Sequence, residues 1–266
     1  MRCNRCPATV FNRRLPFLGG LFLFSAALLL QAKDHVKFGA GEYLSDEGTT
    51  LRYRLYVPEN IEDGAKYPLV IWLHDILGIG LFNREQISGG DAAGAKNWTR
   101  KDVQERHPAF VLAPQCSLGS FWVNFLTRQP SQKLRTIPDL VADLMRQYPI
   151  DPKRLYVAGQ SMGGWGVWAL IEMRPDLFAA AVPVAGAGIP LMAPLIVNTP
   201  VWAFHCSQDR IVNVKESRLM IGALRAVGGS PKYTEYPKLG HTNRCWSTTF
   251  QEPGLVDWLF AQHRTD

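Results

Sequence analysis

The feature that most constrains this chain is the pentapeptide Gly159-Gln-Ser-Met-Gly163. It joins an apolar, strand-like run at 155–158 to apolar residues at helical spacing from Met162 to Met173. A serine at so sharp a strand-to-helix turn is held in a strained backbone conformation, and the flanking glycines let strand and helix approach closely. The pattern therefore predicts that Ser161 is an exposed nucleophile at a helix N-terminus, where free N–H groups favour developing negative charge. An incidental serine in a glycine-rich turn is the alternative.

Strand-like and helix-like runs alternate along the rest of the chain. This alternation predicts an α/β fold, with a mostly parallel central sheet and helices on both faces. The run 51–57 alternates apolar and polar residues, as an edge or half-exposed strand does, whereas 69–73 is continuously apolar, as a central strand is. The other strands are expected at 109–113, 155–158, 179–184, 200–204 and 233–236, and the helices at 136–148, 162–173, 215–227 and 255–262.

No linker or charge run divides the chain, so residues 33–266 are expected to form one domain. Hydrophobic residues make up 47% and charged residues 20%, an ordinary globular composition that can bury a large core. Two long connections, 79–107 and 116–135, are candidate lids or pocket walls, the first with one short helix near 92–98.

Residues 1–32 have the pattern of a secretory signal peptide, a basic start followed by the apolar run 15–30. An uncleaved anchor helix is the alternative. After cleavage the protein would have no stable membrane anchor. It would be periplasmic or secreted. Much of the net charge of +6 comes from four arginines in this segment, so the remainder gives no reason to expect a nucleic-acid partner. These arginines are Arg2, Arg5, Arg13 and Arg14.

Three cysteines follow the predicted signal: Cys116, Cys206 and Cys245. In an oxidising compartment we expect at most one disulfide and one free thiol, and three separate thiols are the alternative. Cys116–Cys245 is the favoured pair, because both are expected in loops at the edge of the sheet that carries Ser161. The cysteine spacing fits no zinc pattern, and no metal site is predicted.

A serine nucleophile needs a base, and the base needs an orienting acid. Asp209 follows the predicted strand at 200–204, and His241 follows the strand at 233–236. The order Ser161, Asp209, His241 is the one expected when acid and base lie in later strand loops. His74 and His205 are rival bases, but both end strands, where bracing of neighbouring loops is the favoured role.

The expected oxyanion hole uses the N–H groups of Met162 and Ile76, the latter in the loop after the strand at 69–73.

Five stretches together resemble the secreted α/β-hydrolases, from about residue 51 to the C-terminus. More narrowly, the chain resembles the esterase or phospholipase/carboxylesterase group near feruloyl esterases, polyhydroxyalkanoate depolymerases and prolyl-oligopeptidase-type domains. The resemblance implies a Ser-His-Asp carboxylic ester hydrolase that needs no cofactor. The stretches are Tyr67-Pro-Leu-Val-Ile-Trp-Leu-His, Ala113-Pro-Gln-Cys, Gly159-Gln-Ser-Met-Gly-Gly-Trp-Gly, Gln208-Asp and Gly240-His.

The chain departs from this group at Asp75 and Cys206, where relatives have glycine. If Asp75 occupied a position that needs φ > 0, it would be strained, and its carboxylate would oppose an oxyanion. The arrangement we favour has Asp75 turned away, held by a loop N–H or by an arginine such as Arg84.

Three functions stay open at this point. The first is an exported serine esterase acting on a small-molecule or polysaccharide-linked ester. The others are a catalytically weakened hydrolase-fold binding protein, which Asp75 and Cys206 would favour, and a serine peptidase of the prolyl-oligopeptidase type. Trp122, Trp165 and Gln115 are candidate substrate contacts, the tryptophans as stacking surfaces for an aryl or sugar group. The sequence does not indicate an oligomeric state.

Overall fold

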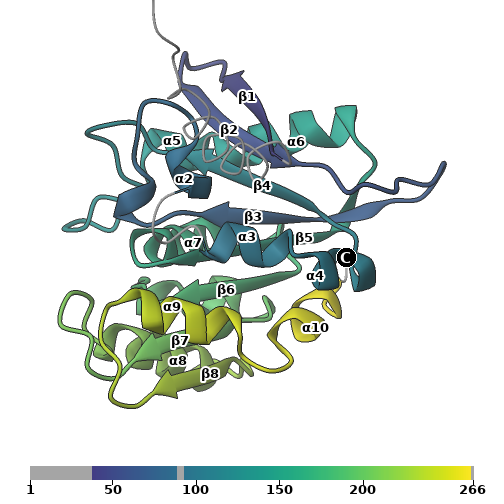
Figure 1. Cartoon of the computed structure of the whole chain (residues 1–266). Helices are drawn as coiled ribbons and strands as arrows, with labels where there is room; N and C mark the ends of the chain where they lie inside the picture. The colour runs from purple at the N-terminus through teal and green to yellow at the C-terminus, as the bar shows by residue number, and fades with distance from the viewer. Residues whose placement is uncertain (1–37, 89–92, 265–266) are drawn as a thin grey trace, which may run out of the picture. The chain divides into compact units, whose positions relative to one another are not determined.

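The computed structural model describes residues 38–88 and 93–264 (Figure 1), and these belong to one compact unit. The predicted signal peptide, residues 1–32, lies outside the described residues. Within the described residues, we find no helix long and apolar enough to cross a membrane.

The centre of the fold is an eight-stranded sheet with the order β1-β2-β4-β3-β5-β6-β7-β8. The pairs β1·β2 and β2·β4 are antiparallel, and every other neighbouring pair is parallel. This arrangement confirms the predicted α/β class. The strands are β1 (Phe38–Leu44), β2 (Thr50–Tyr56), β3 (Tyr67–Leu73), β4 (Phe110–Gln115), β5 (Ile150–Gln160), β6 (Ala180–Val184), β7 (Trp202–Cys206) and β8 (Lys232–Tyr236).

Helices cover both faces of the sheet (Figure 1). The α-helices are α2 (Glu85–Ser88), α3 (Ala93–Trp98), α4 (Lys101–Arg106), α5 (Gln132–Arg135), α6 (Ile137–Gln147), α7 (Met162–Met173), α8 (Lys215–Ala226), α9 (Asn243–Phe250) and α10 (Leu255–Phe260). Two 3₁₀ helices, η1 (Ile76–Gly78) and η2 (Pro190–Ile196), follow β3 and β6.

Strand β3 explains why its sequence is apolar at every position. Leu69, Ile71 and Leu73 pack in one core with α6, α7 and α8, whereas Val70 and Trp72 pack in a second core with α3, α4, α9 and α10. All seven residues of the strand are buried. Because both faces are covered, the strand places its C-terminal end, and the loop that follows it, rigidly beside β5.

Residues 50–56 form strand β2, and its mixture of buried and exposed side chains fits the half-exposed strand predicted at 51–57. The strand does not lie at the edge of the sheet, because β1 pairs along the full length of β2. Strand β1 contains Gly39 and Gly41, and glycine is depleted in strands, so its sequence does not predict a strand. Gly41 lies under the ring of Tyr53, where a Cβ would come within 2.2 Å of the ring. Close packing against the neighbouring strand therefore accounts for glycine at that position.

The long connection 79–107 contains α2, α3 and α4, of which only α3 is at a predicted position. Helix α9 was also not predicted. A lid role for 79–107 or 116–135 stays a prediction.

Candidate active site

Ser161 lies at the turn between β5 and α7, in a backbone conformation that non-glycine residues rarely adopt (φ 52°, ψ −119°). Its N–H donates to the carbonyl of Val184 on β6 at 2.9 Å, which holds the turn in place. A Cβ on Gly163 would lie 1.9 Å from the carbonyl oxygen of Leu73, so only glycine lets the first turn of α7 approach the end of β3. The glycine therefore fixes the turn geometry that the sequence predicts.

His241 lies in the loop between β8 and α9, and its Nε2 is 2.7 Å from Ser161 Oγ. Its ring packs edge-on against the ring of Trp246, with the centroids 4.8 Å apart. The structure thus brings together the serine and the histidine from loops 80 residues apart in the sequence.

Asp209 accepts a hydrogen bond from His241 Nδ1 on its Oδ2 atom at 2.6 Å. Its Oδ1 atom accepts the N–H groups of Ile211 at 2.9 Å and Val212 at 2.8 Å. Burial acts to raise the pKa of Asp209, but hydrogen bonds from His205 and His241 outweigh it and hold the pKa far below its usual range. The carboxylate is therefore ionised and oriented, as an acid that supports an imidazolium must be.

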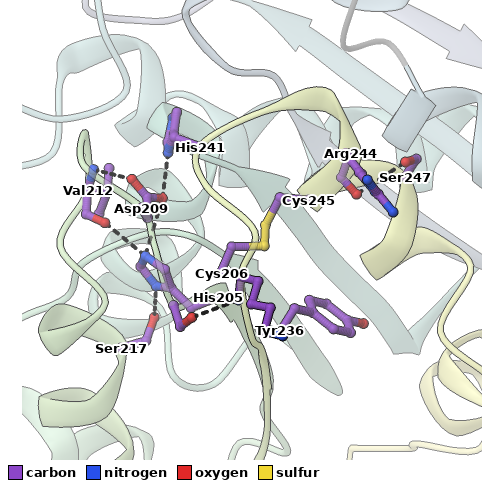
Figure 2. Close-up of a disulfide and its surroundings, with 12 residues drawn as sticks. His205, Cys206, Asp209, Val212, Ser217, Tyr236, His241, Arg244, Cys245 and Ser247 are labelled. Carbon is purple, nitrogen blue, oxygen red and sulfur yellow. Dashed lines mark hydrogen bonds and ion pairs between the residues drawn. A yellow bond between two sulfur atoms is a disulfide. The ribbon is translucent and has the colours of Figure 1, made fainter.

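His205 is fully buried at the end of β7 and braces the loop that carries Asp209 (Figure 2). Its Nε2 donates to Val212 O at 2.9 Å and lies 3.4 Å from Asp209 Oδ2, while its Nδ1 is 2.7 Å from Ser217 Oγ. The partners of its two ring nitrogens are thus Ser217, Val212 and Asp209, and these contacts agree with a bracing role.

His74 is also buried and braces loops. Its Nδ1 donates to Asp75 O at 2.6 Å, and its Nε2 accepts from Cys116 N at 3.0 Å. Burial lowers the pKa of His74 to about 4, against weaker opposing effects of Asp75. The neutral ring ties the end of β3 to the end of β4.

Asp75 has φ −79°, so the concern that it needs a left-handed conformation does not apply. Its Oδ1 accepts from Leu77 N at 2.9 Å and caps η1, and its Oδ2 accepts from Gln160 Nε2 at 3.0 Å. The loop N–H of the favoured arrangement is that of Leu77; the second donor is Gln160, not Arg84. Both carboxylate oxygens are thus turned toward protein donors.

The two predicted oxyanion donors each begin a helix. Met162 is the first residue of α7 and Ile76 the first of η1, and N–H groups at these positions have no partner within their own helix. Gly163 places the start of α7 against Leu73 at the end of β3, three residues before Ile76. Donation from these N–H groups to an oxyanion stays a prediction.

Two of the three candidate substrate contacts are buried and form hydrogen bonds that hold neighbouring loops together. Trp122 is fully buried, and its indole N–H donates to His74 O at 2.9 Å, so it is not a stacking surface. Gln115 is also buried and donates to Gly78 O and Glu85 Oε2, which ties η1 to α2. Trp165 is partly exposed, packs against Phe125, and stays a candidate.

The disulfide joins Cys206 to Cys245, and Cys116 is the free, buried thiol. The predicted Cys116–Cys245 pair is therefore wrong. Cys245 lies on α9, whose first turn packs over the end of β7, and this places it on Cys206 rather than on the loop after β4. Since α9 was not predicted, its packing could not direct the choice.

In residues 38–88 and 93–264 there is no group of three His, Cys, Asp or Glu side chains arranged to hold a metal ion.

Comparison with known proteins gives a consistent group of relatives. The prolyl oligopeptidase family matches residues 128–193, which include Ser161. Poly(3-hydroxyalkanoate) depolymerase C of Paucimonas lemoignei is 27% identical over 186 residues, which cover 66% of this chain and 41% of the depolymerase. Acetylxylan esterase A of Emericella nidulans is 22% identical over 213 residues, 76% of this chain and 66% of the esterase.

Among solved structures, a thermostable esterase superposes with a TM-score of 0.83 and 35% sequence identity, covering 87% of this chain and 64% of that one. A feruloyl esterase module of Clostridium thermocellum superposes with a TM-score of 0.64 at 15% identity, a likeness of fold alone. The chain spans less than two thirds of the length of both the depolymerase and the thermostable esterase.

Proposed function

The chain is an α/β-hydrolase of the group that contains esterases, and we propose that it is a serine carboxylic ester hydrolase. The observation that carries the proposal is the continuous line of hydrogen bonds from Ser161 Oγ through His241 to Asp209. It starts from a serine whose backbone is strained at a strand-to-helix turn. Nucleophile, base and orienting acid are thus in contact before any substrate binds.

In the proposed reaction, Ser161 Oγ attacks the ester carbonyl while His241 Nε2 takes its proton. Asp209 keeps the proton of His241 on Nδ1 and stabilises the imidazolium that forms. His241 then protonates the leaving alcohol, and an acyl group remains on Ser161. Water, deprotonated by the same histidine, releases the acid and restores the serine.

The N–H groups of Met162 and Ile76 are the proposed donors to the carbonyl oxygen as it becomes negative. The contacts of Asp75 support this role. Both of its carboxylate oxygens accept hydrogen bonds from protein groups, Leu77 N–H and the Gln160 side chain, and neither of these donors is a proposed oxyanion donor. Asp75 and Cys206 therefore no longer favour a weakened binding protein: one caps η1 and the other forms a disulfide.

Export to the periplasm or the medium is part of the proposal. The Cys206–Cys245 disulfide supports it, because such bonds form and persist in oxidising compartments. The signal-like pattern of residues 1–32 supports it independently.

The test is labelling by a fluorophosphonate probe, with hydrolysis of p-nitrophenyl acetate measured in parallel. Wild type should be labelled and active, and Ser161→Ala should lose both while keeping its far-UV circular dichroism and Tm. His241→Ala should be nearly inactive, whereas His74→Ala and His205→Ala should mainly lower the Tm. Hydrolysis by Ser161→Ala at the wild-type rate would refute the assignment.

A serine peptidase is the second candidate, favoured by the match of the prolyl oligopeptidase family to residues 128–193. The same three side chains would serve, with His241 protonating a leaving amine instead of an alcohol. Rates on p-nitroanilides of short peptides and on p-nitrophenyl esters separate the two. We expect kcat/KM to favour the ester.

A further inference from the structure

The single disulfide of the described residues lies beside the proposed active site. Cys206 is the last residue of β7 and stands three residues before Asp209. Cys245 is in the first turn of α9 and stands four residues after His241. Figure 2 shows the sulfur bridge and the bond between Asp209 and His241 in one view. Both cysteines are fully buried.

The disulfide shortens the covalent path between acid and base. Along the chain, Asp209 and His241 are 32 residues apart. Through the bridge, the path uses only residues 206–209 and 241–245, and the bond from His241 Nδ1 to Asp209 Oδ2 closes this small ring. Because a shorter tether restricts the relative positions of its ends, the bridge limits how far His241 can move from Asp209.

The two partners differ in how firmly other contacts hold them. The Asp209 carboxylate is fixed by two backbone N–H groups and lies against buried His205. His241, in contrast, sits in a loop whose neighbours from 237 to 244 are exposed or partly exposed. Its ring contacts Trp246, which is itself on α9 next to Cys245. The acid is therefore held by its own loop, and the base depends on where the first turn of α9 lies.

The two ends of α9 are attached differently. At its C-terminal end, Phe250 packs edge-on against Trp72 and Trp98 in the second core. At its N-terminal end, the bond from Cys245 to Cys206 fixes the helix to β7. Backbone bonds from Ser207 N to Tyr236 O and from Gln208 N to Leu239 O join the two loops only before His241. After His241, the disulfide joins the start of α9 to β7.

We infer that the Cys206–Cys245 disulfide is a positioning element that holds His241 in register with Asp209 and Ser161. The inference rests on the proposed function for its catalytic consequence, but the geometry it describes can be measured without catalysis. It predicts that loss of the bridge lowers turnover by more than loss of stability alone explains.

The test compares wild type with Cys206→Ala/Cys245→Ala, which lacks the covalent link. We expect kcat on p-nitrophenyl acetate to fall at least tenfold while KM changes less than twofold, because substrate contacts are kept and the base loses its position. The rate of fluorophosphonate labelling should fall in parallel. Cys206→Val/Cys245→Ala fills more of the buried volume and is the second variant, should the first fail to fold.

Two controls separate positioning from stability. Leu140→Ala truncates a buried side chain of α6 and should lower the Tm while kcat stays within twofold of wild type at a temperature where it is folded. Cys116→Ala removes the buried thiol that takes no part in the bridge, and it should also keep kcat.

The proton NMR signal of His241 Nδ1–H is a measurement that does not depend on hydrolysis. This signal lies far downfield when the proton is donated to a carboxylate. It should be present in wild type, in Leu140→Ala and in Cys116→Ala, and lost or broadened in the disulfide variants; His241→Gln assigns it. If the disulfide variants keep this signal and their kcat and only melt lower, the inference is wrong. If wild type neither hydrolyses esters nor reacts with the probe, the proposed function fails, while the NMR comparison still decides whether the bridge holds His241.

Discussion

The two carboxylate oxygens of Asp209 have different hydrogen-bond partners, backbone N–H groups on Oδ1 and His241 on Oδ2. An isosteric substitution therefore tests the role of the acid. In Asp209→Asn, the N–H groups of Ile211 and Val212 would keep the amide oxygen at the Oδ1 position. The amide NH₂ would then face His241 Nδ1 and force the proton onto Nε2, so the histidine could not accept the proton of Ser161. In the Ser-His-Asp triad of serine proteases, the equivalent substitution lowers kcat about 10⁴-fold for this reason.

We therefore expect Asp209→Asn to lower kcat roughly 10³- to 10⁴-fold with little change in KM. Steady-state kinetics on a p-nitrophenyl ester, with circular dichroism to verify the fold, measures this. Asp176→Asn, at an exposed ion pair with Arg174, is the matched control and should be fully active. A fall of less than tenfold in Asp209→Asn would contradict the assigned role of the acid.

His74 predicts a pH dependence of stability. Burial lowers its pKa to about 4 in the folded protein, whereas an unfolded histidine has a pKa near 6.5. The unfolded state therefore binds the extra proton first, and the folded state loses stability as the pH falls from about 6.5 to about 4, by roughly 3 kcal/mol. Above pH 6.5 the ring is neutral in both states and this effect is absent.

The check is urea unfolding of wild type and His74→Gln at pH 7, 5.5 and 4. Other titrating groups affect both proteins alike, so the stability advantage of wild type should shrink on acidification. A constant difference between the two proteins across this range would show that His74 is not the group responsible.

At the scale of single residues, local patterns predict the residues whose chemistry depends on sequence neighbours. Ser161 stands out because its glycines and flanking elements are contiguous in the chain. The burial of Trp122 could not be predicted, because it results from a loop folding back so that the indole reaches His74 O. Such contacts depend on tertiary packing, which leaves no periodic signal in a loop.

Among the elements, the contact between α7 and β3 is the one that tolerates least change. In Gly163→Ala, the new Cβ would lie 1.9 Å from Leu73 O and 2.9 Å from His74 O, both backbone atoms that cannot rotate away. We expect destabilisation of about 3 kcal/mol or more, or failure to fold. Gly222→Ala, at an exposed position of α8 with open space around it, should instead stabilise by about 0.5–1 kcal/mol.

Thermal unfolding of the two variants beside wild type decides the matter. Opposite changes in Tm are the expected result. Equal changes would mean that the start of α7 is free to move away from β3, so that Gly163 does not fix the serine turn.

Elements with strong periodicity were predicted near their observed bounds, as α6, α7 and α8 show. Strand β1 was missed because its glycines hide the alternation, and α9 because its sequence, Asn-Arg-Cys-Trp-Ser-Thr-Thr-Phe, is mostly polar and β-branched. Both are held by tertiary contacts, β1 by the ladder with β2 and α9 by Phe250 and Cys245. The disulfide pairing was predicted wrongly because the sequence does not predict α9, which brings Cys245 to Cys206.

Over the whole molecule, exposed apolar side chains gather in the loops that follow β3, β4, β6 and β7, at the sheet edge that carries Ser161. We call this set the apolar rim. A substrate with an apolar acyl chain can bury part of the rim, whereas an acetyl ester is too short to reach far beyond the serine. The set consists of Ile76, Leu77, Leu81, Phe82, Leu118, Phe121, Phe125, Leu126, Leu191, Leu195 and Ile211.

Leu126 is 94% exposed and is the most accessible member of the rim. We expect Leu126→Ser to lower kcat/KM for p-nitrophenyl hexanoate up to about fivefold, about 1 kcal/mol of lost apolar contact, and to leave the acetate unchanged. Ile61→Ser, in the connection between β2 and β3 away from the rim, is the control and should affect neither ester. An equal loss on both esters would point to a change in the catalytic residues instead.

The remaining thiol has a practical consequence for experiments in solution. Burial raises the pKa of Cys116 to about 12, and the other two cysteines of the described residues are joined to each other. At neutral pH this part of the chain therefore offers no thiolate to a maleimide. A cysteine introduced in place of Leu126 would take a fluorophore or spin label at a single known position in residues 38–88 and 93–264. Ligand arrival at the rim could then be followed optically, without turnover and without first removing any native cysteine from that part of the protein.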